Sequence, residues 1–474
     1  MGAATALALV FVAGFAAAPE ALANRWHATP ELEVVETYTD NVDLSPINRK
    51  WDLVTRVTPG VTVQGRSGRS RFDMTYRLNF LAFARSDEKT DVRHYLNLSG
   101  NSELIDRLLF VDVRGSVNQQ FQDIGGAVSG NQDNATDNRR TVQNYNISPY
   151  LQRDLGSFAR ATLRYRVGYV EVGGDEPVNP LFTDFLSKAW THQASFKLDS
   201  GRRFGRFNWH ALAQRDWDER EAPRRDSESS RVQLNGDYQV SDWLTLLASV
   251  GYDDVDDTSL INDRDGVSWN LGATLRGART VLTVRGGERY NSMNWSAQLT
   301  YEFSERTRLT AGYSEQVTTT LRILQDELGE AEPGGPVVDP GGFSLIDSAF
   351  KRHRVFATLS GSRGRSTFSM NGFYEERRTD TASPDQNRYG GHGSLSRRFS
   401  PSLSGFVAGS YEKTEQLELG MRDDDFYSAQ TGLNYVLTRY ISGGITYIFT
   451  KRDSTDPSRD LKENAVKINI RATF

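Results

Sequence analysis

The feature that most constrains this chain is an alternation of apolar and polar residues that repeats from Pro30 to Phe474. Each repeat is a run of roughly ten to fifteen residues followed by a turn, and a period of two places successive side chains on opposite faces of a β-strand. The clearest run is Phe72–Phe80 (FDMTYRLNF), and the last run is Val466–Phe474 (VKINIRATF). The pattern therefore predicts a long series of strands, each with one apolar and one polar face.

The connections between these runs alternate in length. Short turns are expected at Arg66–Arg69, Gly156–Ser157 and Leu437–Arg439, whereas long polar loops are expected at Asp123–Arg139 and Leu324–Ile346. Short periplasmic turns that alternate with longer outer loops are typical of bacterial outer-membrane barrels. We therefore predict an all-β fold, a transmembrane antiparallel β-barrel of about 22 strands within a range of roughly 18–24.

Composition agrees with this class. Hydrophobic residues make up 38% of the chain and the mean hydropathy is −0.55, and after the N-terminal segment no stretch is apolar over the ~18 residues that a membrane helix needs. The 19 Tyr, 24 Phe and 8 Trp suit the aromatic girdles of a barrel. The absence of Cys excludes disulfides and thiolate catalysis. The net charge of −5 argues against a nucleic-acid partner.

The N-terminus predicts export. Residues 1–23 read as a signal peptide, with an apolar stretch at Ala3–Ala18 and a small-x-small cleavage site at Ala21–Ala23, although no Lys or Arg precedes the apolar stretch. The barrel is then expected to occupy residues 24–474. Alternation begins within about ten residues of the cleavage site, so we expect no plug domain. A TonB-dependent receptor has a similar strand number but needs a plug before its first strand, and the sequence disfavours that class.

The C-terminal residue, Phe474, closes the apolar face of the last run. A terminal aromatic residue on an alternating strand resembles the signal that barrel-assembly machinery recognises. We therefore expect that machinery as a partner, together with outer-membrane lipid and lipopolysaccharide, and predict that the chain resides in the outer membrane of a Gram-negative bacterium.

The polar faces of the strands are rich in cations and should line the lumen, because a large barrel turns its apolar face to lipid. A basic wall would favour anionic solutes, and the alternative is a solvated wall with local ion pairs. Acidic residues are expected mainly in loops, for example Asp253–Asp257 and Asp423–Asp425. The predicted lumen-lining basic residues are Arg77, Arg114, Arg160, Arg164, Arg166, Lys197, Arg276, Arg285, Arg289, Arg308, Lys467 and Arg471.

Catalytic and metal-binding motifs are not found in the sequence. The six His are scattered over different predicted strands, and there is no H-E-x-x-H motif, no Cys ligand and no G-x-S-x-G elbow. Residues Gly361–Gly364 form a turn motif rather than a phosphate-binding loop. We therefore expect no enzyme activity, no catalytic residues, no metal and no cofactor.

Three stretches carry a resemblance to a known family: Glu31–Ser45 (ELEVVETYTDNVDLS), Trp51–Phe80 and Leu96–Gln120. They resemble the outer-membrane β-barrel family associated with the PEP-CTERM/exosortase system. Members of that family are barrels found beside exopolysaccharide biosynthesis genes, and no catalytic residues can be carried over. The resemblance implies exopolysaccharide or periplasmic export components as partners.

Two kinds of function remain open at this point. The leading hypothesis is a porin-like channel that serves exopolysaccharide export or the passage of anionic solutes. The alternative is a structural or partner-gated barrel without an open pore, with an adhesive or assembly role or as a sheath for an electron-transfer partner. The long loop Leu324–Ile346 could fold inward or protrude into solvent, and the sequence does not decide between these.

Overall fold

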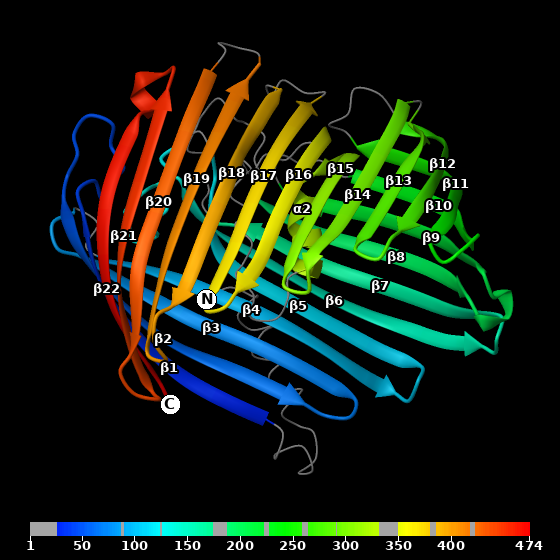
Figure 1. Cartoon of the computed structure of the whole chain (residues 1–474), viewed down its shortest axis with the longest axis horizontal. Coiled ribbons are helices and arrows are strands. Elements are labelled where there is room, and N and C mark those ends of the chain that lie inside the picture. Colours follow the sequence, from blue (N-terminus) through cyan, green and yellow to red (C-terminus); the bar gives the residue numbers. More distant parts are fainter. Residues whose placement is uncertain are drawn as a thin grey trace.

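The computed structural model describes residues 26–86, 90–123, 126–173, 187–221, 227–257, 264–290, 292–330, 349–379, 385–417 and 422–474. The predicted signal peptide, residues 1–23, lies outside the described residues. Within them the chain forms one antiparallel sheet of 22 strands. The sheet closes on itself through pairing of the first and last strands (Figure 1), so the predicted barrel and its strand number are confirmed.

The strand bounds follow the alternating runs. The strands are β1 Trp26–Thr39, β2 Asp52–Arg66, β3 Ser70–Phe83, β4 Thr90–Ile105, β5 Leu109–Phe121, β6 Arg139–Leu155, β7 Ala159–Val172, β8 Lys188–Ser200, β9 Phe207–Arg220, β10 Ser227–Gln239, β11 Leu244–Asp257, β12 Arg264–Arg276, β13 Thr280–Arg289, β14 Ser292–Ser304, β15 Thr307–Thr319, β16 Ala349–Arg363, β17 Ser366–Thr379, β18 Gln386–Arg398, β19 Leu403–Gln416, β20 Arg422–Val436, β21 Ile441–Ser454 and β22 Leu461–Thr473. The described helices are α2 Thr320–Glu330 and the 3-10 turns η2 Arg202–Phe204 and η3 Pro457–Arg459.

The seam between β1 and β22 completes the hydrogen-bond ladder. Glu31 pairs with Thr473 at one end of the seam, and Thr39 pairs with Ala465 at the other. Beyond the last strand residue, the Phe474 N–H donates to the Pro30 carbonyl (2.9 Å). The Phe474 side chain is 71% exposed. It lies on the same outward face as Ile470 and Ile468, as the alternation predicts.

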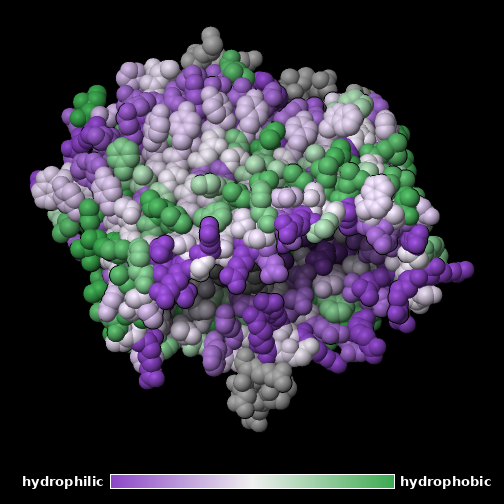
Figure 2. Space-filling view, viewed as in Figure 1, coloured by the Kyte–Doolittle hydropathy of each residue, from purple (hydrophilic) through white to green (hydrophobic). Residues whose placement is uncertain are grey.

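The two faces of the wall have opposite chemistry. Outward positions carry exposed apolar residues such as Leu271 (61%), whereas inward positions carry buried polar residues such as Thr37 (0%). Figure 2 shows a band of apolar residues across the visible outer face, with hydrophilic side chains above the band and around the hollow below it. Outward tyrosines pair near the outer ends of strands, for example Tyr374 with Tyr389 and Tyr411 with Tyr427. These rings suit the interface between lipid and water.

Most loop lengths sort by side as predicted, but on the side of the long loops β13 ends at Arg289 and β14 already begins at Ser292. At the end of the barrel that carries the predicted short turns, the connections are short. Gly156 and Gly364 adopt left-handed backbone in two of these turns, with φ of +62° and +60°.

The loop predicted at Leu324–Ile346 instead begins inside helix α2. The acidic runs predicted in loops belong to strands, because Asp253 lies in β11 and Asp424 lies in β20. The parts of β11 and β20 that carry these acids extend past the apolar band of the barrel. In these parts the residues no longer alternate between apolar and polar, so the sequence pattern does not identify them as strand.

The orientation of the faces predicts how the barrel responds to a buried charge. Leu234 and Gln233 are neighbours on β10 and point to lipid and lumen, respectively. Leu234→Arg should lower the free energy of unfolding by about 2–4 kcal/mol, because the charge enters the apolar part of the bilayer. Gln233→Arg is the control and should change it by less than about 1 kcal/mol, because the lumen is polar. Urea titration in lipid vesicles measures both, and equal effects would contradict the assignment of faces.

Candidate functional site: the lumen and its inward segments

The connection between β5 and β6 folds into the lumen. We call its described residues 126–138 the lumen segment. Its residues Asn131, Asp133 and Asn134 are almost completely buried, with exposures of 0%, 1% and 0%. They lie against the inward faces of β1, β2 and β22, since their partners are side chains of those strands. The lumen segment therefore occupies part of the interior of the barrel.

A buried ion-pair cluster holds the lumen segment. The Asp133 carboxylate accepts from Thr37 Oγ1 (2.8 Å) and from Arg56 Nη1 (2.8 Å), and it pairs with Lys467 Nζ (2.8 Å). Burial alone would raise the pKa of Asp133, but the charges of Lys467 and Arg56 outweigh burial and hold that pKa well below its usual range. Asp133 is therefore ionised at neutral pH, and it cancels part of the charge that its two cationic partners bring.

A second carboxylate next to this cluster is bound by neutral donors. Glu463 of β22 is fully buried and accepts from Thr39 Oγ1 (2.7 Å), from Asn131 Nδ2 (2.8 Å) and from Asn134 Nδ2 (3.2 Å). Ser129 Oγ also donates to it. Two of the strands and the lumen segment thus share one hydrogen-bond network, in which the polar groups that burial removes from water have protein partners.

Apolar contacts support the same segment. Val54, Leu81 and Phe83 point inward from β2 and β3, where a water-filled lumen would expose them. They form a buried cluster with Val42, and Ala135 of the lumen segment packs against it. Covering these side chains removes apolar surface from water, which stabilises the inward position of the segment by about 25 cal/mol per Å² of area covered.

Helix α2 is a second structure inside the lumen. Its Leu321 and Leu324 pack on the inward residues Val142, Val170 and Ala189 of β6, β7 and β8. The Leu324 carbonyl accepts from Asn144 Nδ2 (2.6 Å), and the Gln325 amide donates to Asn144 Oδ1 (2.8 Å). The long loop after β15 therefore begins inside the barrel, which answers the question that the sequence left open for this part of it.

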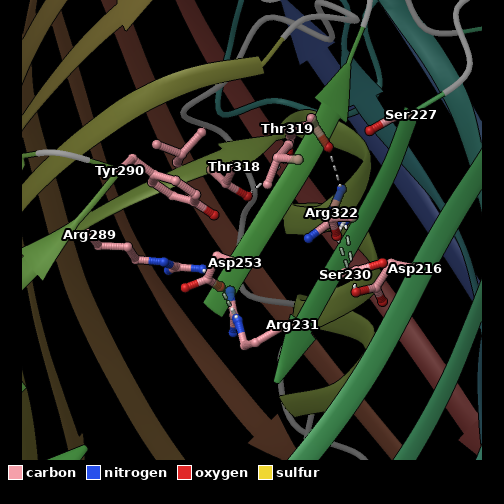
Figure 3. Close-up of a pocket in the computed structure, with 13 residues that line it drawn as sticks. Asp216, Ser227, Ser230, Arg231, Asp253, Arg289, Tyr290, Thr318, Thr319 and Arg322 are labelled. Carbon is pink, nitrogen blue, oxygen red and sulfur yellow. Dashed lines mark hydrogen bonds and ion pairs between the residues drawn. The ribbon is translucent and has the colours of Figure 1, made fainter. Parts of the chain in front are cut away.

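A pocket lies where α2 meets the wall (Figure 3). Asp253 of β11 stands at its centre and accepts from Arg231 Nε (2.6 Å) and Arg289 Nη2 (2.8 Å). Arg322 of α2 reaches the same pocket, donates to Ser229 Oγ (2.7 Å) and lies 4.0 Å from Asp216. Three guanidinium groups and two carboxylates from β9, β10, β11, β13 and α2 thus converge in this pocket.

The predicted lumen-lining cations face inward, but most of them are paired with acids. Ion pairs join Arg77 to Glu31, Arg160 to Asp154 (2.7 Å), Arg164 to Asp112 (2.7 Å), Lys197 to Asp199 (2.8 Å), Arg289 to Asp253 (2.8 Å), Arg308 to Glu302 (2.8 Å), Lys467 to Asp133 (2.8 Å) and Arg471 to Glu33 (3.2 Å).

The other predicted cations lie at inward positions as well. Arg166 Nε donates to Ser148 Oγ (3.3 Å), and Arg276 Nη1 donates to Thr245 Oγ1 (2.8 Å). Arg114 and Arg285 occupy inward positions of β5 and β13. The cations are therefore spread around the barrel instead of forming one ring, and the sequence underestimated the number of acids beside them. A role for these residues in anion passage stays a prediction.

A further cationic surface, which was not predicted from the sequence, lies on the inward faces of β16–β21. Acids pair with some of its cations, as Glu375 does with Arg352 (2.7 Å) and Arg377 (2.7 Å). Phenylalanines lie between the charges. We call this surface the Arg–Phe wall. Its cations are Arg352, Arg354, Arg377, Arg388, Arg422 and Arg452, its acids are Glu375, Glu412 and Asp424, and its aromatic residues are Phe350, Phe356, Phe373 and Phe426.

The signal for the Arg–Phe wall is present in the sequence. Arg352, Arg354 and Phe356 follow at period two on β16, and Phe373, Glu375 and Arg377 do so on β17. Aromatic residues are also common on the lipid face of a barrel strand, so phenylalanines that share a face with arginines do not stand out in the sequence. Cross-strand pairing, as of Phe356 with Phe373, supplies the missing information.

Two features are absent from the residues that the structure describes. No group of three or more His, Cys, Asp or Glu in the described ranges could hold a metal ion. In the same ranges no helix is long and apolar enough to cross a membrane.

Solved structures with the same fold are iron and siderophore transport proteins. The FrpB iron transporter from Neisseria meningitidis in its apoprotein form has a TM-score of 0.57 and 11% sequence identity, over 96% of this chain and 82% of that one. The siderophore receptor PirA from Acinetobacter baumannii has a TM-score of 0.55 and 9% identity, over 96% and 81%. A mutant of the ferric enterobactin receptor PfeA from Pseudomonas aeruginosa has 0.54 and 9%, over 94% and 80%. At this identity the likeness shows the fold alone.

The sequence comparisons add a partial match. The model of the family described as "Putative beta-barrel porin 2" matches residues 387–474, which cover β18–β22. No curated protein matches the chain. The fold, the two-faced wall and these matches together define a porin-like β-barrel of the outer membrane. The family and the structural neighbours are described as porins, transporters and receptors, and none of them is described as an enzyme.

The prediction of a barrel without a plug domain is wrong. The structural neighbours that share the barrel fold of this chain are TonB-dependent receptors, which contain a plug. The prediction rested on how soon alternation begins. Alternation shows where the strands start, but it does not show what fills the interior of the barrel. Among the described residues the lumen segment and α2 lie in that space.

The buried cluster around Asp133 should slow hydrogen exchange in the lumen segment, and this effect can be measured. Asp133→Asn removes the charge that Arg56 and Lys467 face, and loss of one partner in a buried pair costs about 3–5 kcal/mol. Backbone hydrogen exchange in residues 126–138 should become roughly 100- to 5,000-fold faster. Asp137→Asn, an exposed change in the same segment, is the control and should leave exchange unchanged. Equal rates in both variants would show that the cluster does not hold the segment.

The same cluster gives a pH dependence. The pKa of Asp133 is lowered in the docked segment, so the ionised carboxylate contributes its full stabilisation above the ordinary aspartate value of about 4. This contribution is lost only as the pH falls below that value toward the lowered pKa. Exchange in residues 126–138, corrected for intrinsic rates, should therefore stay constant from pH 7 to about 5 and rise below about 4. A rise between pH 7 and 5 would contradict this assignment.

Proposed function

We propose that this protein is a transport barrel of the outer membrane that passes anionic solutes through a lumen narrowed by the lumen segment and α2. The observation that carries the proposal is the composition of the Arg–Phe wall, where six arginines stand against three acids among the residues that the structure describes. Glu375, for example, is shared between Arg352 and Arg377, so the three groups together keep a positive charge. Inward charges of one sign raise the local concentration of ions of the opposite sign.

The interior geometry supports a narrowed passage. The lumen segment covers the wall at β1, β2 and β22, whereas α2 covers the wall at β6, β7 and β8. These two regions lie apart in the strand order, so the lumen is occupied at two places along its circumference. A solute must pass between them, or one of them must move.

Ion selectivity tests the proposal. Refolded protein in planar bilayers under a KCl gradient should give a reversal potential that shows preference for chloride over potassium. Arg285→Glu, on the inward face of β13, should reduce that preference, because it replaces a cation in the lumen with an anion. Arg279→Glu makes the same charge change in the short turn before β13 and should have little effect. Cation preference in the unaltered protein would overturn the proposal.

The position of α2 predicts a change in conductance. Leu324→Ser removes apolar contacts with Val142 and Val170, at a cost of about 2–4 kcal/mol, and should release α2 from the wall. Single-channel conductance should then change in size or in open time. Leu324→Met keeps the side-chain volume and serves as the control. Identical traces from both variants, in protein with the heat-modifiable migration of a folded barrel, would show that α2 does not limit the passage.

The identity of the solute is the finer part of the proposal. The resemblance to the exosortase-associated family favours an acidic exopolysaccharide, and the neighbours' names favour anionic iron chelates. Both belong to the class of anionic solutes. A soluble acidic polysaccharide and a ferric chelate are each added to the conducting protein, and the compound that blocks the chloride current identifies the favoured solute. If the folded protein gives no chloride current at all, a partner-gated barrel is favoured.

A further inference from the structure

The Arg–Phe wall combines charge with apolar ring surface over several neighbouring strands, an arrangement that Arg164 and the Tyr150 ring (4.1 Å) show on a smaller scale at β6 and β7. Phe356 and Phe373 are directly opposite each other on β16 and β17, and both point inward. Both rings are only half-buried, so part of each faces the lumen. Equivalent inward positions on β13 and β14 carry small polar residues such as Thr283 and Ser296. Water-facing phenyl rings in a polar lumen therefore need an explanation.

The arginines are placed over these rings. The guanidinium carbon of Arg354 lies 5.6 Å from the centre of the Phe356 ring, and that of Arg388 lies 5.1 Å from the Phe373 ring. Arg452 repeats the arrangement over Phe426 at 5.9 Å. Such cation–π contacts fix a guanidinium plane beside an aromatic face.

The acids of the wall hold the arginines in place without cancelling them. Glu412 binds Arg388 through two of its nitrogens, which fixes the direction of the guanidinium group. Glu375 lies between Arg352 and Arg377 and pairs with both of them. Ordered guanidinium groups with a net positive charge recognise carboxylates well, because their N–H groups match the two carboxylate oxygens.

We propose that the Arg–Phe wall is a binding site for anions that carry a flat apolar face, of which aromatic carboxylates are the simplest. This inference rests on the proposed function, because it names the kind of anion that the lumen selects. The carboxylate binds a guanidinium group of Arg354 or Arg388, and the ring of the anion packs against Phe356 and Phe373. Offset contact between aromatic rings stabilises such a complex beyond the area that it buries.

The proposal separates flat anions from other anions. A purely electrostatic wall would attract every carboxylate of equal charge to the same degree. A purely apolar wall would bind an uncharged aromatic compound as well as a charged one. Only a surface that uses both features prefers an aromatic carboxylate over an aliphatic carboxylate and over a neutral aromatic amide.

Fluorine NMR of small probes tests this with the full-length protein folded in detergent micelles. The probes are 4-fluorobenzoate, 4-fluorobenzamide and 4-fluorocyclohexanecarboxylate, and their transverse relaxation reports binding. We expect 4-fluorobenzoate to bind most tightly. Phe356→Ala combined with Phe373→Ala should weaken its binding roughly tenfold, because both ring contacts are lost.

Control variants keep the test specific. Phe368→Ala removes a phenyl ring from the lipid-facing side of β17 and should leave binding unchanged. Arg354→Gln should weaken binding of the benzoate but not of the benzamide, whereas Arg365→Gln in the turn after β16 should do neither. Equal binding of benzoate and cyclohexanecarboxylate, or an equal effect of Phe368→Ala and Phe373→Ala, would overturn the proposal.

The result is independent of ion conduction. Probe binding that depends on Phe373, in protein that shows no anion preference in bilayers, would support this site and refute the proposed function. Anion preference without preferential binding of the aromatic probe would support the proposed function and refute this site.

Discussion

Everything in this structure depends on one constraint, namely that backbone N–H and C=O groups inside a bilayer must find partners within the protein. A sheet meets that constraint only when it has no free edge, so the pairing of β1 with β22 is the interaction on which the other strands rely. The pairing of Phe474 with Pro30 extends the seam by one residue past the last strand. The terminal phenylalanine thus lies where the two edges of the sheet join.

In the closed barrel every second side chain of a strand points inward, and many of these inward side chains are charged. A charge that the wall or an inserted segment buries is costly unless a partner accompanies it. The protein meets this with shared carboxylates: Asp133 serves Arg56 and Lys467, Asp253 serves Arg231 and Arg289, and Glu375 serves Arg352 and Arg377. Sharing leaves a positive excess while each buried cation still has a partner.

The sequence predicted the wall of this barrel far better than its interior. Alternation at period two reports which face a residue such as Ile470 occupies, and this sufficed for the strand number and for the inward position of the predicted cations, but not for the Arg–Phe wall. It carries no information about contacts across the lumen, so the partners of Asp133 and the position of α2 could not be predicted. The pairing of Asp133 with Lys467 joins residues far apart in the chain, and only closure brings them together.

The two inserted structures are held by different forces, and this makes them separately adjustable. The lumen segment is held chiefly by charge and hydrogen bonds around Asp133 and Glu463, whereas α2 is held chiefly by the apolar contacts of Leu321 and Leu324. Apolar attraction weakens on cooling, whereas a buried ion pair responds to proton concentration. Cold and acid would therefore loosen different parts of the same barrel, so each environmental variable acts on its own side of the lumen.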